Sequence, residues 1–165
     1  MGAIQAKVEQ VEAWDRIHLK GRIGEGTAEA LGKLLEGVGK NCLINFRGIT
    51  DANSCGIAEW VEFMQKAGAD RNVVFEQCPP AIVNVINMIP AFRGNAKVYS
   101  VYAPYGCGEC GKSQWHLYTS GVNMPEGDQL SDSVEPEEVM PKDCKCNRAF
   151  SPQVDLAEFF EFNVD

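Results

Sequence analysis

The stretch from Leu43 to Met64 changes its hydrophobic period in the middle, and this change constrains the fold more than any other feature of the sequence. Its first part is an apolar run too short for a helix, made of Leu43, Ile44, Phe46 and Ile49. In its last part the apolar residues recur at i, i+3, i+4 and i+7, namely Ile57, Trp60, Val61 and Met64, with Glu59, Glu62 and Lys66 on the other face. The stretch therefore predicts a buried strand that leads into an amphipathic helix.

A tight polar turn is expected between this strand and this helix. It contains Thr50, Asp51, Asn53 and Ser54, whose short polar side chains suit turns and helix N-caps. A helix N-terminus presents unpaired backbone N–H groups and the positive end of the helix dipole, which favour an anion or an acidic group of a partner. At Asn53 and Ser54, simple capping of the helix stays open beside a binding role.

The same residues carry a resemblance to a known family. The pattern of an apolar strand, Gly-Ile-Thr, a polar turn, Asn53-Ser54-Cys55-Gly56-Ile57 and a helix resembles the core motif of the STAS family, which sulfate transporters and anti-sigma-factor antagonists share. The resemblance covers about residues 1 to 104. It implies the α/β fold of that family and a protein regulator as partner, such as a kinase or an anti-sigma-like protein.

The resemblance also bears on regulation. Regulatory STAS members usually read Asp-Ser-Ser-Gly, and a kinase phosphorylates the second serine. Aligned on Gly56, this chain has Asn53, Ser54 and Cys55 at the three preceding positions. The phosphoacceptor position thus holds a cysteine, so phosphorylation would move to Ser54 or Thr50, or the switch would be absent.

The order of predicted elements indicates an α/β fold with a mixed sheet packed with helices, because strand-helix-strand steps favour parallel pairing. We expect strands at Ile4–Val11, Arg16–Ile23, Leu43–Ile49, Asn72–Gln77 and Lys97–Ala103, a helix capped by Thr27, and a short helix between Pro79-Pro80 and Pro90. The first domain is expected to span residues 1–104.

Charge and hydropathy limit the classes of function. Residues 1–100 are neutral, whereas residues 101–165 carry the whole net charge of −8, which argues against binding a nucleic-acid backbone. No apolar run approaches the ~18 residues that span a bilayer, and the start of the chain lacks the pattern of a signal peptide. The expected location is cytoplasmic, without a membrane partner.

Residues 105–165 are expected to form a second, zinc-ribbon-like segment. Cys107, Cys110, Cys144 and Cys146 form two close pairs that can supply four thiolates to one structural zinc ion per chain. Two disulfides or four free thiols are the alternatives, and a reducing cytosol argues against the disulfides. Because four thiolates leave no open coordination position, such a zinc would be structural.

The remainder of this segment gives three further expectations. Gln114 to Tyr118 has strand character, and the polar residues from Thr119 to Pro141 are expected to form a mobile loop. The end of the chain must dock on something, because its apolar side chains are too large to leave in water: Leu156, Phe159, Phe160 and Phe162. Trp60 and Trp115 are both expected in or near a core.

No catalytic arrangement is legible in the sequence. There is no P-loop, and neither His18 nor His116 has a carboxylate partner that the sequence identifies. His116 is a minor rival for a zinc position. The first interpretation is a non-catalytic signalling protein that binds a partner through Thr50 to Ile57. The alternatives are a thiol or metal enzyme that uses Cys55 or the zinc site, and a zinc-ribbon nucleic-acid binder; a homo-oligomer stays open as well.

Overall fold

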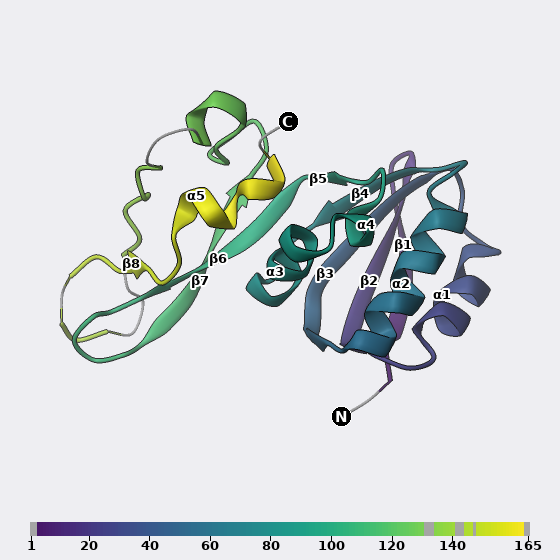
Figure 1. The fold of residues 1–165 in the computed structure, drawn as a ribbon, viewed down its shortest axis with the longest axis horizontal. Helices are drawn as coiled ribbons and strands as arrows, with labels where there is room; N and C mark the ends of the chain where they lie inside the picture. Colours follow the sequence, from purple (N-terminus) through teal and green to yellow (C-terminus); the bar gives the residue numbers. More distant parts are fainter. Residues whose placement is uncertain (1–2, 131–133, 141–143, 147, 164–165) are drawn as a thin grey trace. The chain divides into compact units, whose positions relative to one another are not determined.

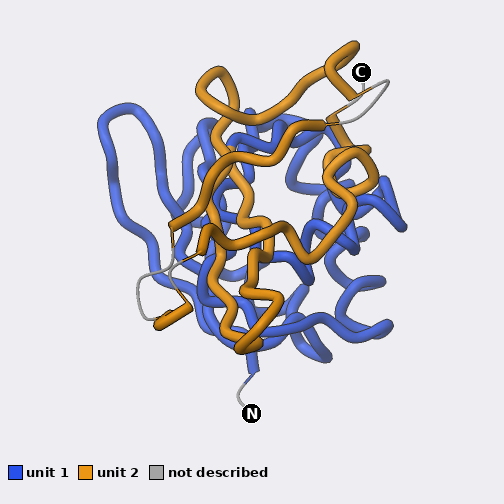
Figure 2. The backbone as a smooth tube through the Cα atoms, turned by 90° about the vertical axis from the view of Figure 1, so that its left-hand side faces the viewer, with its two compact units in different colours: residues 1–99 blue, residues 100–165 orange. Residues whose placement is uncertain are grey.

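The computed structural model describes residues 3–130, 134–140, 144–146 and 148–163, and the chain divides into two compact units, residues 1–99 and 100–165 (Figures 1 and 2). The boundary expected after residue 104 thus falls within a strand of the second unit. The predicted strand Lys97–Ala103 is divided into β5 (Lys97–Val98) and β6 (Ser100–Gly106), which belong to different sheets. The sequence suggests one strand because buried apolar residues occur in both β5 and β6, for example Val98 and Val101. Tyr99, which is half exposed, separates the two strands.

The first unit contains a five-stranded mixed sheet in the order β1-β2-β3-β4-β5. Strands β1 and β2 form an antiparallel hairpin, and β2 to β5 are parallel to their neighbours, so the predicted α/β fold with a mixed sheet is confirmed. The strands before β5 are β1 (Gln5–Val11), β2 (Trp14–Ile23), β3 (Asn41–Ala52) and β4 (Asn72–Glu76).

All helices of the first unit lie on one side of this sheet (Figure 1). They are α1 (Thr27–Leu35), α2 (Ser54–Ala67), α3 (Pro80–Met88) and α4 (Pro90–Arg93). The strands follow one another in a single direction across the parallel part of the sheet, and right-handed crossovers then place every connecting helix on the same face. No helix among the described residues of the first unit lies on the opposite face of the sheet.

The core between α2 and the sheet is aromatic. Trp60 is fully buried, as expected, and its ring lies 5.3 Å from that of Phe46 on β3 and 5.1 Å from that of Phe92 on α4. Its indole Nε1 donates a hydrogen bond of 2.9 Å to the carbonyl oxygen of Phe92. These contacts fix α2 against the sheet, because a buried indole has both its ring packed and its one donor satisfied.

The expected cap of α1 is wrong. The helix is preceded by Gly26, in the left-handed conformation with φ 87°, and Thr27 is its first residue. Thr27 is buried, and its Oγ1 donates to the carbonyl of Gly24 at 2.7 Å instead of accepting from the helix N-terminus. The hydroxyl therefore closes the preceding turn rather than capping the helix.

The second unit is built on a three-stranded antiparallel sheet in the order β7-β6-β8. Its elements after β6 are β7 (Ser113–Thr119), η1 (Gly127–Leu130), β8 (Ser151–Pro152), α5 (Leu156–Phe159) and η2 (Glu161–Asn163). The end of the chain docks within this unit: Phe160 is fully buried, with its ring 4.9 Å from that of Tyr118.

Two expectations for the second unit are corrected. Trp115 is half exposed beside Tyr102, because alternation along β7 turns its neighbours His116 and Tyr118 to the covered side and Trp115 to the other. The segment expected to be mobile packs at the positions that the structure describes, since it buries the spaced apolar side chains of Met124, Leu130 and Val139. Residues 131–133 and 141 of this segment lie outside the described residues. No helix in the described part of the chain is long and apolar enough to span a membrane.

Candidate functional site

The junction between β3 and α2 is tighter than the sequence predicts. Strand β3 continues to Ala52 and pairs with β2 through Arg22 opposite Asp51, so Thr50 and Asp51 belong to the strand and not to a turn. The Thr50 hydroxyl donates to the carbonyl of Gly21 at 3.1 Å, and the Asp51 carboxylate forms an ion pair of 2.5 Å with Arg22. Polar residues can occupy the end of this strand because they are exposed there.

Asn53 alone connects the strand to the helix, and it caps α2. Its Oδ1 accepts a hydrogen bond of 2.8 Å from the N–H of Gly56, and its own N–H donates to the carbonyl of Ile23 at 3.0 Å. Gly56 is buried against the end of β2, where a Cβ would lie 2.1 Å from the carbonyl oxygen of Ile23. Only glycine lets the first turn of α2 approach β2 this closely.

Ser54 and Cys55 are the exposed residues of this first turn. They occupy the first two positions of α2, where backbone N–H groups have no partner within the helix. The positive end of the helix dipole lies at the same place, so a negative group of a partner is favoured there. The junction thus presents two small side chains on a backbone that Asn53 and Gly56 hold in place.

The remainder of α2 agrees with the predicted amphipathic pattern, and the structure adds Phe63 to the apolar face and a capping contact of Glu59. Trp60 and Met64 are buried as expected, together with Phe63, while Ile57 and Val61 are half-buried. Glu59 lies on the other face of the helix, as predicted, and makes a contact that the pattern did not reveal. Its carboxylate accepts hydrogen bonds from the N–H groups of residues 28 and 26, at 3.0 and 3.2 Å, and these bonds lower its pKa. Glu59 therefore caps α1, which the glycine before that helix cannot do.

The four cysteines of the second unit converge as their spacing predicts. The Sγ atoms of Cys107, Cys110, Cys144 and Cys146 all lie within 4.8 Å of one another. Four Zn–S bonds of about 2.3 Å give a tetrahedron with edges of about 3.8 Å, so a small contraction brings all four thiolates to bonding distance. The donor set therefore fits a structural zinc ion, and His116 is not part of it.

Backbone amides favour the thiolate form of one cysteine of this cluster, Cys107. The N–H groups of Cys110 and Glu109 point at the sulfur of Cys107 and lower the pKa of its thiol to about 6. The turn closes through a hydrogen bond of 3.2 Å from the N–H of Gly111, at φ 74°, to the carbonyl of Cys107. An ion pair of 2.7 Å between Glu109 and Arg148 ties the turn to the segment that follows the second cysteine pair.

Both histidines have carboxylate partners that sequence reasoning missed. His18 Nε2 lies 2.8 Å from Glu9 Oε2, and His116 Nε2 lies 2.5 Å from Glu137 Oε2. The first pair could have been found from the register of the β1–β2 hairpin, which brings the two residues onto one face of adjacent strands. The pair of His116 and Glu137 joins residues 21 positions apart, and no local sequence pattern indicates that they meet.

The His116 pair organises the acidic segment of the second unit. The Glu137 carboxylate also accepts from Asn123 Nδ2 at 3.0 Å, and the His116 ring stands edge-on to those of Tyr105 and Tyr118. The two tyrosine hydroxyls are hydrogen-bonded to each other at 2.5 Å, and burial raises the pKa of both. The arrangement holds the segment around Glu137 to the sheet.

We expect the contacts of Glu137 with His116 and Asn123 to stabilise the protein less in acid. The hydrogen bond from His116, with a smaller effect of Asn123, lowers the pKa of Glu137 below its ordinary value of 4.5. A lowered folded pKa gives stability that is present above the unfolded pKa and is lost as the pH falls through the folded one. Thermal melts between about pH 6 and pH 3 should therefore show a smaller acid-induced loss for Glu137→Gln than for the wild type. The exposed Glu135→Gln in the same segment should retain the wild-type profile, and equal profiles for all three proteins would contradict the assignment.

Comparisons with known proteins add a structural likeness. No family model matches the chain, and no curated protein matches it. A solved structure of an anti-sigma factor antagonist from Mycobacterium paratuberculosis is similar, with a TM-score of 0.49 and 17% sequence identity. The match covers 59% of this chain and 86% of that one.

Proposed function

We propose that the protein is a non-catalytic signalling protein that binds a protein regulator, in the manner of a STAS-type anti-sigma-factor antagonist. The binding surface is the β3–α2 junction: Thr50, Asp51, Asn53, Ser54, Cys55 and Gly56. The observation that carries the proposal is the exposure of Ser54 and Cys55 on the first turn of a helix whose backbone is fixed. The motif resemblance supports the same surface.

The chemistry of this surface suits recognition rather than catalysis. Asn53 is occupied as a cap and Asp51 as the partner of Arg22, so neither is arranged as a base beside a nucleophile. What the junction offers is backbone donors, small side chains and a fixed shape, which a kinase or an anti-sigma-like regulator can read through an acidic or phosphorylated group.

If the junction is phosphorylated, Ser54 is the favoured acceptor. Thr50 uses its hydroxyl to bond the Gly21 carbonyl within the sheet, whereas Ser54 is exposed at the first position of α2. A phosphate at a helix N-terminus is stabilised by the dipole and the free N–H groups. Mass spectrometry on protein from its native cells tests this. Phosphate on neither residue would favour constitutive binding.

The second unit completes the proposal as a zinc-ribbon-like module. One structural zinc ion held by Cys107, Cys110, Cys144 and Cys146 would tie the β6–β7 turn to the segment before β8. None of the seven cysteines, all of which the structure describes, forms a disulfide, which suits a reducing cytoplasm. The metal would stabilise a unit too small for a large core of its own.

Ser54→Asp should separate binding from folding. A carboxylate at the first position of α2 interacts favourably with the helix dipole, so the free energy of unfolding should be unchanged or higher by ~0.3 to 1 kcal/mol. A partner that packs on the junction must desolvate this new charge, so its binding should be lost or strongly weakened. Thermal melting and pull-down from native cells measure the two effects.

Gln65→Glu provides the matched control. It adds the same charge to an exposed position of the same helix, three turns from the junction, and should leave partner recovery unchanged. If Ser54→Asp keeps its melting temperature and still recovers every partner of the wild type, the junction is only a helix start and the functional surface lies elsewhere.

A further inference from the structure

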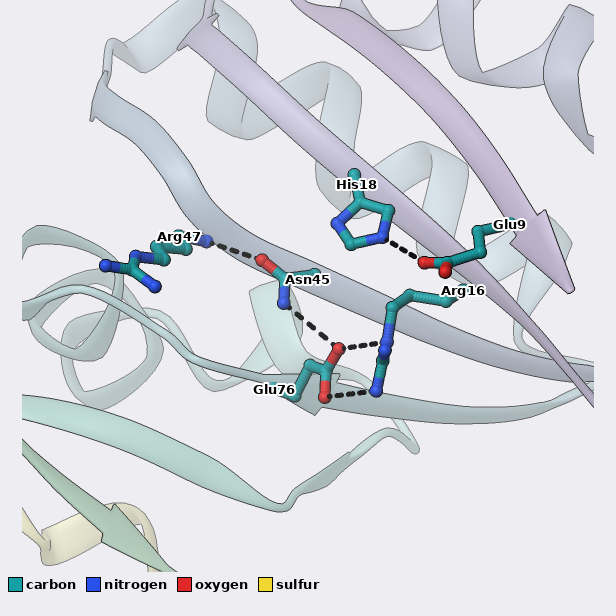
Figure 3. Close-up of polar contacts among 6 residues, drawn as sticks. All are labelled: Glu9, Arg16, His18, Asn45, Arg47 and Glu76. Atoms are coloured by element: carbon teal, nitrogen blue, oxygen red, sulfur yellow. Dashed lines mark hydrogen bonds and ion pairs between the residues drawn. The ribbon is translucent and has the colours of Figure 1, made fainter. Parts of the chain in front are cut away.

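The helix-free face of the first unit's sheet carries a polar network that the proposed function does not use. Register places Lys7, His18, Asn45 and Glu76 opposite one another across β1, β2, β3 and β4. Figure 3 shows that β2, β3 and β4 bring Arg16, His18, Asn45 and Glu76 to one surface. The face is therefore a continuous polar surface, on the side of the sheet opposite α2.

Part of this network is buried and rigid. The Glu76 side chain is only 6% exposed, and its carboxylate accepts a hydrogen bond of 3.0 Å from Asn45 Nδ2. Arg16 Nε lies 2.7 Å from Glu76 Oε1, and Arg16 also donates from its second nitrogen to Oε2 at 3.4 Å (Figure 3). A buried carboxylate paired in this way fixes the position of the guanidinium, because leaving that charge unpaired would be strongly destabilising.

A bulge shapes the surface beside this network. The register between β2 and β3 shifts between His18 and Lys20, which is paired with Gly48. Asn45 Oδ1 accepts the N–H of Arg47 at 3.0 Å, and so satisfies the backbone that the bulge releases. Gly48 is required there, since a Cβ would lie 2.6 Å from the carbonyl oxygen of residue 19. Bulges of this kind re-aim side chains beside binding sites.

The bulge and the network line a shallow hollow of about 610 Å³ that is open to solvent. This volume lies within the range of small-molecule sites, about 300 to 1,000 Å³. Its principal polar lining residues are Arg16, His18, Lys20, Asn45, Arg47 and Gln77.

The charge of this face is positive although the chain is acidic. Among the described strand residues of this face, the four cationic side chains Lys7, Arg16, Lys20 and Arg47 stand beside two carboxylates, Glu9 and Glu76, which pair with His18 and Arg16. Lys20 forms no ion pair within the part of the chain that the structure describes. A cationic hollow with fixed guanidinium and amide groups is complementary to an anion.

We propose that this hollow binds a small organic anion that carries at least two phosphate or carboxylate groups. Lys20 and Arg47 lie at the bulge and form a cationic pair for one anionic group. On the strand before it, the pairs with Glu76 and Glu9 do not use Arg16 Nη1 and His18 Nδ1, which can donate to a second anionic group. Arginine forks suit both carboxylate and phosphate oxygens. The site is separate from the β3–α2 junction.

Isothermal titration calorimetry on the full chain tests the proposal, with pyrophosphate, ATP and citrate as probes at about 0.15 M salt. We expect saturable binding of at least one probe, and the comparison of citrate with the phosphates decides which anionic group is preferred. Lys20→Ala and Arg47→Ala should each weaken binding about tenfold or more, because each removes a charge-assisted contact.

Lys33→Ala is the matched control, since it removes one exposed positive charge from α1 and should leave the affinity within about twofold of the wild type. Thermal melts show that each variant is folded. Absence of saturable binding of all three probes to the wild type would overturn the proposal, as would equal weakening by Lys20→Ala and Lys33→Ala.

Discussion

Cys110→Ser is expected to abolish zinc binding and to unfold the second unit while the first stays folded. Apparent binding free energies of structural zinc sites are about 10 to 16 kcal/mol, far more than a small sheet gains by packing alone. The first unit is a separate compact unit with its own core around Trp60 and Phe46. Loss of one thiolate should therefore act on residues 100–165 alone.

Three measurements check this expectation. Elemental analysis of the wild type, purified without added metal, should give about one zinc per chain. Hydrogen exchange should show loss of protection in β6 and β7 of the variant and retained protection in β3 and α2. Cys55→Ser, an exposed cysteine outside the cluster, should keep both the metal and the protection. A metal-free wild type would remove the zinc proposal, and joint unfolding of both units would show that they share one cooperative core.

The fold of the first unit could be predicted because its signals are local. The change of period between Leu43 and Met64 marks a strand and a helix, and the alternation of elements leaves few arrangements beside a mixed sheet. The end of β3 could not be placed, since Thr50 and Asp51 have turn-like chemistry and are held in the strand only by pairing with β2. Tertiary pairing overrides local preference at such positions.

The cysteine cluster could also be predicted, because paired cysteines identify themselves by spacing. The groups that the sequence did not reveal are joined over long separations. Glu59 reaches the N-terminus of α1 from 31 and 33 residues away, and Arg16 meets Glu76 from 60 residues away. Strand register and the path of the connecting helices determine which residues meet. In the sequence alone, such a Glu or Arg cannot be told from a solvent-exposed charged residue.

Gly56→Ala is expected to destabilise the first unit by about 3 kcal/mol or more. The added methyl would lie 2.1 Å from the carbonyl oxygen of Ile23, 2.3 Å from its carbon and 2.5 Å from the N–H nitrogen of Gly24. All three are backbone atoms, so no side chain can rotate away, and α2 must move from β2. That movement would also weaken the cap of Asn53 on the Gly56 N–H. Urea unfolding measures the loss.

Gly32→Ala on α1 is the contrasting variant, because the same methyl there meets nothing within 4 Å. Glycine within a helix costs roughly 0.5 to 1 kcal/mol relative to alanine, so this variant should be more stable than the wild type by about that amount. Replacing glycine by alanine should thus lower the free energy of unfolding at position 56 and raise it at position 32. If Gly56→Ala unfolds at the same urea concentration as the wild type, α2 does not begin against β2, and the fixed junction on which partner binding is proposed does not exist in that form.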